Sequence, residues 1–192
     1  MSNQLTIENT SIADLKIIQR HFVTDHRGYF ERLFCSSELY PIFGLRTIKQ
    51  INHSQTKSVG TVRGMHFQYP PFAETKMVSC IRGRIFDVAI DIRNESPTYL
   101  QWFGLELDDS SGKSLFIPEG FAHGFQSLEP CSEILYFVSA PYNKSSESGI
   151  NALDPRISVN WPIRVSERSK KDSSQPMLED SFQGVDLSIG II

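Results

Sequence analysis

The chain has few cysteines, and they follow no pairing pattern. Cys35, Cys80 and Cys131 are odd in number, widely spaced and outside any Cys-x-x-Cys arrangement. This usage argues against a disulfide framework and against a cysteine-based zinc site. We therefore expect free thiols that are buried in a core.

Long apolar stretches and clustered charge are also missing. No apolar run approaches the roughly 20 residues that span a bilayer, and the N-terminal stretch MSNQLTIENTSIADL lacks a basic start and a continuous apolar core. The formal net charge is −3, and lysines and arginines are scattered. This distribution does not favour nucleic acid or an anionic membrane as a partner. We expect a cytoplasmic protein that binds a small molecule.

Short β-forming runs are abundant. The 192 residues, 40% hydrophobic and 11% aromatic, can fill one core, so a single domain over 1–192 is expected. There is no internal repeat and no strong helical periodicity beyond a possible turn at 36–43. Strands are expected at 15–18, 29–34, 47–51, 77–92, 99–107, 114–117, 124–128 and 133–138. This spacing predicts a mainly β fold, a jelly-roll β-barrel with short peripheral helices.

A spaced frame of glycines, histidines and one proline lies within this β-rich region. Its members are Gly60, His66, Gly83, Gly112, Pro118, Gly120 and His123. The frame is similar to the cupin pattern, but Gln68 and Lys76 occupy the positions where a second His and a Glu would bind metal. Lysine carries a positive charge and offers no lone pair, so it repels a divalent cation and suits an anion. We expect no metal and no cofactor, and a pocket that holds developing negative charge.

The segment TVRGMHFQYPPFAETKMVSCIRGRIFDVAIDIRNESPTY, together with FIPEGFAHGF, carries a more specific resemblance. It resembles the dTDP-4-dehydrorhamnose 3,5-epimerase family, metal-free cupins that act on nucleotide-linked 4-keto-6-deoxy sugars. The similarity extends from DHRGYF through QIN and ILYFVSAPYN to DPRISVNWP and VSERSKKDSSQP, about four fifths of the chain. It implies an isomerase that epimerises C3, C5 or both without a cofactor, through an enolate.

The resemblance implies four catalytic residues. His66 is the base, since imidazole exchanges protons near neutral pH. Asp172 orients that imidazole from a C-terminal loop and tail, 164–192, which packs near the active site. Lys76 stabilises the enolate oxygen. Tyr136 returns a proton on the face opposite the base, because one group working on one face could not invert a centre.

The same resemblance implies residues that bind the nucleotide diphosphate. Arg27 and Arg63 lie at the pocket mouth, where guanidinium groups suit phosphate, with Gln50 and Asn52 on the sugar or phosphate side. Taken alone, Asp25 and Arg27 would also fit a turn salt bridge.

Further pocket residues are implied less directly. His123 and Asp87 match polar positions of the family pocket, where His123 supports the carbonyl side or a local hydrogen-bond network. Tyr142 is a second helper near the site. Family members are homodimers with exchanged N-terminal strands, which would bring Arg27 and Phe30 to the partner's site.

One position departs from the family pattern. Many dTDP-specific members have a Glu two residues after the Phe of the RG-x-F segment, whereas this chain reads Phe30-Glu31-Arg32. Arg32 cannot accept the imide hydrogen of thymine. The carrier is therefore left open between dTDP, CDP and another nucleotide.

Several functions stay open at this point. The leading interpretation is epimerisation in deoxysugar and surface polysaccharide biosynthesis. A mono-epimerase acting at C3 or C5 only, or a catalytically silent nucleotide-sugar-binding cupin, is the alternative. A metal-dependent oxygenase or sugar isomerase would need ligands to replace Gln68 and Lys76.

Overall fold

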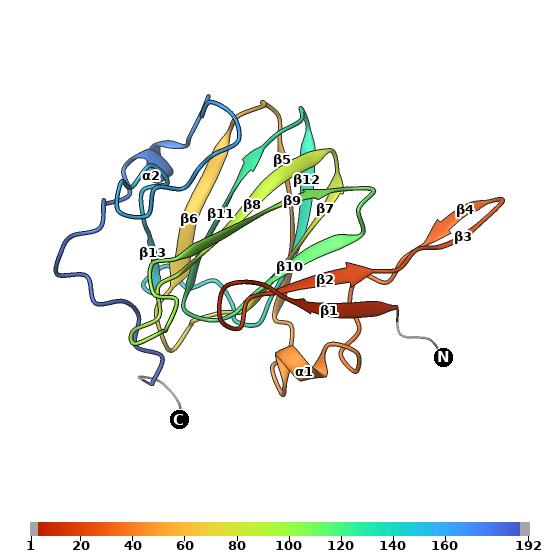
Figure 1. Ribbon diagram of the computed structural model, residues 1–192, viewed down its shortest axis with the longest axis horizontal. Coiled ribbons are helices and arrows are strands. Elements are labelled where there is room, and N and C mark those ends of the chain that lie inside the picture. Colours follow the sequence, from red (N-terminus) through yellow and green to blue (C-terminus); the bar gives the residue numbers. More distant parts are fainter. Residues whose placement is uncertain (1–3, 189–192) are drawn as a thin grey trace.

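Two antiparallel sheets make up most of the molecule (Figure 1). The computed structural model describes residues 4–188. One sheet has six strands in the order β1-β2-β10-β7-β12-β5, and the other has five in the order β13-β6-β11-β8-β9. The bounds are β1 Leu5–Asn9, β2 Lys16–Arg20, β5 Gln50–Thr56, β6 Val62–Gln68, β7 Lys76–Arg82, β8 Arg84–Asp91, β9 Trp102–Asp108, β10 Lys113–Ile117, β11 Phe121–Ser127, β12 Ser132–Val138 and β13 Glu147–Gly149.

A hairpin and two short helices lie outside the two sheets. Strands β3 (Val23–Asp25) and β4 (Gly28–Phe30) form a hairpin that projects away from the sheets (Figure 1). Helix α1 spans Tyr40–Phe43 and helix α2 spans Lys170–Ser173. No helix among residues 4–188 is long and apolar enough to cross a membrane.

The main core lies between the facing sheets. Val78 and Cys80 of β7 and Ile134 of β12 pack there against Ile85 and Ala89 of β8. Because side chains alternate along a strand, the inner face of β7 continues to Lys76 and that of β12 continues to Tyr136. The apolar core thus leads directly into the polar residues of the predicted site.

The outer faces of both sheets are covered as well. Leu39 and Phe43 pack on the six-stranded sheet over Met77, Phe116 and Phe137. On the five-stranded sheet, segments from the C-terminal third bury Val88 and Ile90. Strands buried on both faces read as continuous apolar runs, which explains why the sequence pattern of β7 and β8 lacks a clean alternation.

The predicted mainly β fold with short helices is confirmed, and the two packed sheets agree with a jelly roll. Several boundaries were wrong. The range 77–92 is two strands, because Gly83 turns the chain with a φ of +71°. The range 29–34 holds only the end of the exposed hairpin. Strands β1, β3, β6 and β13 were not expected, and β6 was hidden because Arg63, His66 and Gln68 interrupt its apolar pattern.

The three cysteines are free, as predicted, but only Cys80 is buried. Cys35 and Cys131 are half-buried. Burial raises the pKa of the Cys80 thiol to about 12, so this residue acts as a small apolar side chain of the core.

Candidate active site

A cavity of about 310 Å³ opens between the two sheets, next to the core. The five-stranded sheet contributes His66 of β6, and the six-stranded sheet contributes Lys76 of β7 and Tyr136 of β12. Six of the predicted site residues line it: Gln50, Asn52, His66, Lys76, Tyr136 and Tyr142. The structure therefore brings together side chains that are up to 92 positions apart in sequence, from Gln50 to Tyr142.

His66 and Asp172 form the predicted pair. The imidazole Nε2 lies 2.5 Å from the carboxylate Oδ1 of Asp172, whose side chain is only 6% exposed. The predicted loop contains a one-turn helix, α2, whose first turn holds Asp172. Ser169 begins this turn because its hydroxyl accepts a 3.0 Å hydrogen bond from the backbone N–H of Asp172. The 164–192 stretch thus places Asp172 on the site, and its residues 189–192 lie outside the described residues.

The environment of Asp172 favours its ionised form. Burial raises the pKa of this carboxyl, but the hydrogen bond and charge of His66, together with hydrogen bonds from Ser169 and the backbone of Gly64, outweigh burial and lower it. Gly64 is needed at this position, since its φ is +119° and a Cβ would lie 2.6 Å from the Cα of Gly124. A fixed carboxylate beside the imidazole can hold the ring orientation and stabilise the imidazolium.

Lys76 has an acidic neighbour that the sequence did not single out. Its Nζ lies 3.1 Å from Oε1 of Glu74 and 3.5 Å from the backbone oxygen of His66. Glu74 also accepts a hydrogen bond from Gln68, and all three side chains line the cavity. The signal for Glu74 was its position two residues before Lys76, because such residues share a face of an extended chain.

Tyr136 faces the cavity from the sheet opposite His66. Burial raises the pKa of this phenol, the nearby charge of Arg63 opposes the rise, and Glu74 adds to it. The hydroxyl consequently keeps its proton at neutral pH and can act as a proton donor.

Tyr142 is held at the exposed side of the cavity. Its hydroxyl donates a 2.9 Å hydrogen bond to Oε2 of Glu147, and its backbone N–H donates one of 2.8 Å to Oε1 of Gln50. Glu147 forms an ion pair with Lys171, the neighbour of Asp172. Neither Glu147 nor Lys171 was predicted from the sequence, although the adjacency of Lys171 to Asp172 was a usable signal.

Arg63 lies beside a second cavity of about 620 Å³ that also touches His66. Lys57, Lys171 and Asp172 line it too. Nη2 of the exposed Arg63 donates a 2.9 Å hydrogen bond to the backbone oxygen of Gln55. Three cations and two carboxylates, those of Glu167 and Asp172, therefore border the space next to the base, and the cations can bind an anionic group.

His123 and Asp87 lie behind this site and do not line the 310 Å³ cavity. His123 pairs with His66 across strands β11 and β6, and its Nε2 lies 2.7 Å from Oδ1 of Asp87. Both side chains are buried. Of the two roles expected for His123, the local hydrogen-bond network is the one that its contacts support.

Arg27 and Phe30 lie on the projecting hairpin, and the structure does not place them at the cavity of their own chain. Arg27 forms a 2.5 Å ion pair with Asp25, so the alternative of a turn salt bridge is confirmed. The expectation that Arg27 and Phe30 reach the site of a partner stays a prediction, and the hairpin extends away from the sheets of its own chain (Figure 1).

Glu31 and Arg32, the residues that left the nucleotide carrier undecided, form ion pairs within the N-terminal segment. Glu31 lies 3.2 Å from the buried guanidinium of Arg20, and Arg32 forms an ion pair with Glu38. Neither lines the cavity of this chain.

A two-sheet fold with an imidazole and a phenol facing each other across an inner cavity defines a cupin-type protein suited to moving protons. The family model described as dTDP-4-dehydrorhamnose 3,5-epimerase matches residues 9–180. A dTDP-4-dehydrorhamnose 3,5-epimerase of Sinorhizobium fredii is 42% identical over 187 residues, covering 95% of this chain and 96% of the relative. One of Salmonella typhimurium is 38% identical, covering 93% and 98%.

Solved structures agree with these sequence matches. The dTDP-6-deoxy-D-glucose-3,5-epimerase of Legionella pneumophila, in complex with dTDP-4-keto-L-rhamnose, superposes with a TM-score of 0.88 at 34% identity, covering 95% of this chain and 98% of that one. The chain belongs to the dTDP-4-dehydrorhamnose 3,5-epimerase family, whose members are isomerases.

Proposed function

We propose that the protein inverts C3, C5 or both in a dTDP-linked 4-keto-6-deoxyhexose. The observation that carries the proposal is the placement of His66 and Tyr136 on opposite sheets across one cavity. Inversion requires that a proton leave one face of the sugar and that another arrive on the opposite face. An imidazole paired with Asp172 and a protonated phenol are the groups that this reaction needs.

The chemical steps follow from these positions. His66 takes the proton α to the C4 carbonyl, the C–H electrons form the enolate double bond, and the carbonyl oxygen becomes an oxyanion. The ammonium of Lys76 stabilises that charge. When the enolate collapses, the carbon takes a proton from Tyr136, and solvent then reprotonates the phenolate and deprotonates the imidazolium.

The bordering residues can hold the rest of the substrate. Gln50 and Asn52 line the sugar side, Arg63 and Lys171 border the adjoining space for the diphosphate, and Tyr142 lies at the exposed side. The proposal keeps His123 as a buried support of the strand that carries His66.

The proposal includes a homodimer. The hairpin exposes Tyr29 and Phe30 at 62% and 59%, large aromatic surface that a second copy can bury. In such a dimer Arg27 and Phe30 reach the site of the partner. Light scattering of the wild type and of Phe30→Asp tests this assembly, and a monomeric wild type would contradict it.

The proposed carrier is dTDP. The names of the similar proteins specify dTDP, and the guanidinium of Arg32 is already paired with Glu38. Calorimetry with dTDP and CDP as competitors should show a preference for dTDP. A preference for CDP would contradict this assignment.

The proposed setting is the cytoplasm, where the product would supply deoxysugars for surface polysaccharide such as the O-antigen of lipopolysaccharide. The activated sugars in the names of the relatives support this setting. Loss of the deoxysugar from surface polysaccharide after deletion of the gene would test it.

The decisive experiment follows the sugar protons directly. The EDTA-treated protein is mixed in D₂O with dTDP-4-keto-6-deoxyglucose, and the H3 and H5 signals are followed by proton NMR. We expect both signals to disappear as solvent deuterium enters. Exchange at one position would instead indicate a mono-epimerase, and tight binding without exchange would indicate a silent binding protein.

A further inference from the structure

Glu74 and Lys76 form an ion pair that is largely removed from water. Their side chains are 9% and 12% exposed, and the carboxylate Oε1 lies 3.1 Å from Nζ. Shielding from solvent strengthens this attraction, and it makes loss of either partner costly. The orientation of the ammonium is therefore tied to the position of Glu74.

The position of Glu74 is in turn determined by Gln68. The amide nitrogen of Gln68 donates to Oε2 of Glu74, to the backbone oxygen of Phe72 at 2.9 Å and to that of Pro141 at 3.2 Å. Its amide oxygen accepts a 2.6 Å hydrogen bond from the backbone N–H of Asn143. A reversed amide would place oxygen against three acceptors, so only one orientation of Gln68 satisfies these contacts.

This arrangement leaves Lys76 with donor capacity. An ammonium has three N–H groups, and here Glu74 accepts one while the backbone oxygen of His66 lies 3.5 Å away. We propose that Glu74 is a positioning residue that, held by Gln68, fixes the Lys76 ammonium so that a remaining N–H meets the substrate oxyanion. The inference rests on the proposed function and assigns a role to a residue that does not itself contact the reacting atoms.

The charge of Glu74 also acts on Tyr136. Burial is the main reason that the pKa of this phenol is raised, and Glu74 contributes in the same direction. Replacing Glu74 by a neutral residue should therefore let Tyr136 ionise at lower pH. The other charged or titratable groups near this part of the cavity are His66, Lys76, Arg63, Tyr142, Glu147, Lys171 and Asp172.

The kinetic test compares Glu74→Gln, Glu74→Asp and Glu106→Gln. Glu74→Gln should lower kcat about tenfold with little change in KM, and it should move the alkaline limb of the kcat profile to lower pH. Glu74→Asp keeps the charge but retracts it, so kcat should fall while the alkaline limb stays in place. Glu106→Gln removes one carboxylate from the exposed pair with Arg84 and should match the wild type. Wild-type kcat and pH profile in both Glu74 variants would overturn the proposal.

A substrate-free measurement separates this inference from the proposed function. The protein is labelled with ¹³C at the ring Cζ of its six tyrosines, and the Tyr136 signal is assigned by its loss in Tyr136→Phe. Its titration midpoint should lie at lower pH in Glu74→Gln than in the wild type or in Glu106→Gln. An unchanged midpoint would overturn the electrostatic part of the proposal, even if the wild type epimerised a sugar. If the midpoint shifts in Glu74→Gln but the wild type exchanges no sugar proton, the coupling of Glu74 to Tyr136 stands and the proposed function is contradicted.

Discussion

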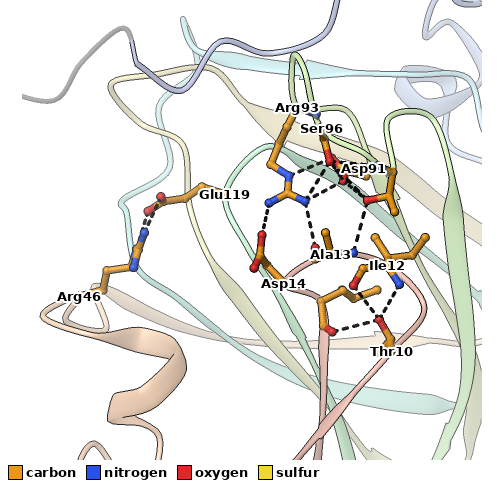
Figure 2. Close-up of polar contacts among 11 residues, drawn as sticks. Thr10, Ile12, Ala13, Asp14, Arg46, Asp91, Arg93, Ser96 and Glu119 are labelled. Atoms are coloured by element: carbon orange, nitrogen blue, oxygen red, sulfur yellow. Dashed lines mark hydrogen bonds and ion pairs between the residues drawn. The ribbon is translucent and has the colours of Figure 1, made fainter.

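Two clusters of buried charge in this molecule differ in how many hydrogen-bond partners their cations have within the chain. In the first, shown in Figure 2, Asp91 is fully buried and accepts two hydrogen bonds from the guanidinium of Arg93, at 2.9 and 2.7 Å. Arg93 also donates to Asp14 and to the backbone oxygen of Ala13. In the second, Lys76 has Glu74 and one distant backbone oxygen, and the cavity lies beside it.

The direction of a pKa shift does not separate the two clusters. Burial raises the pKa of Asp91, but hydrogen bonds from Arg93, Ser96 and Thr98 outweigh burial and lower it. The pKa of Asp172 is lowered in the same way, by His66. Both clusters also border a cavity. What separates a structural network from a site is that all three guanidinium nitrogens of Arg93 donate to acceptors of the chain, whereas Lys76 has only Glu74 and a distant backbone oxygen. We therefore expect substitutions in the cavity cluster to lower activity, and substitutions in the Arg93 cluster to lower stability.

Breaking the cavity cluster should abolish activity and spare the fold. His66→Ala should reduce exchange of the sugar α-protons by about 10²–10⁴-fold, because a positioned general base contributes that much. Thermal stability should fall less than in a variant that breaks the Asp91–Arg93 pair, since the His66 side chain is about one-third exposed and Asp172 keeps hydrogen bonds from Ser169 and the backbone of Gly64. The measurement is loss of the H3 and H5 signals in D₂O, and wild-type exchange would remove His66 as the base.

Tyr136→Phe is the contrasting variant for this prediction. It removes the returning acid and leaves the base, so some exchange should persist while inversion is impaired. Equal loss of exchange in both variants would contradict separate roles on the two faces of the sugar.

Breaking the Asp91–Arg93 cluster should lower the stability of the fold and spare the activity. Arg93→Met leaves the carboxylate of Asp91 buried without its main partner, and we expect a loss of about 3–5 kcal/mol in the free energy of unfolding. The activity of the protein that remains folded should be unchanged. Urea unfolding measures the loss, with Arg46→Met as the control. The pair of Arg46 with Glu119 is more exposed, so its loss should cost less than about 1 kcal/mol. Equal costs would contradict the distinction.

The sequence predicted the parts of the site that a motif or a family pattern marks. The frame around His66 and the resemblance at Lys76, Tyr136 and Asp172 placed residues that the structure does bring to one region. The roles of these residues stay predictions until the variants are measured. The order of the strands in the two sheets could not be predicted from the sequence, because it depends on which apolar faces meet in three dimensions.

The missed residues share one physical reason. Glu74 precedes strand β7, Glu147 begins β13 and Lys171 lies in the short helix α2, and at all three places a solvated side chain is the usual outcome. Glu147 and Lys171 pair with each other across a long stretch of sequence. Glu74 pairs with Lys76 at the cavity. The place of the hairpin in an assembly stays a prediction, because a segment that reaches out from its own chain leaves no local pattern that shows where it goes.

The smallest expected effect is the pH dependence of the Asp91 cluster. Because the folded-state pKa of Asp91 lies below the unfolded one, its ionisation contributes stability above the unfolded pKa, and this contribution is lost as pH falls through the folded pKa. Asp91→Asn should therefore be destabilised most near neutral pH, and its difference from the wild type should shrink toward acid. Asp25→Asn is the control, since water screens the exposed pair of Asp25 with Arg27 and its pH dependence should be far weaker. Urea midpoints measured from about pH 7 to about pH 3 would show this. A difference for Asp91→Asn that stays constant with pH would mean that lost hydrogen bonds, and not the buried charge, make this cluster structural.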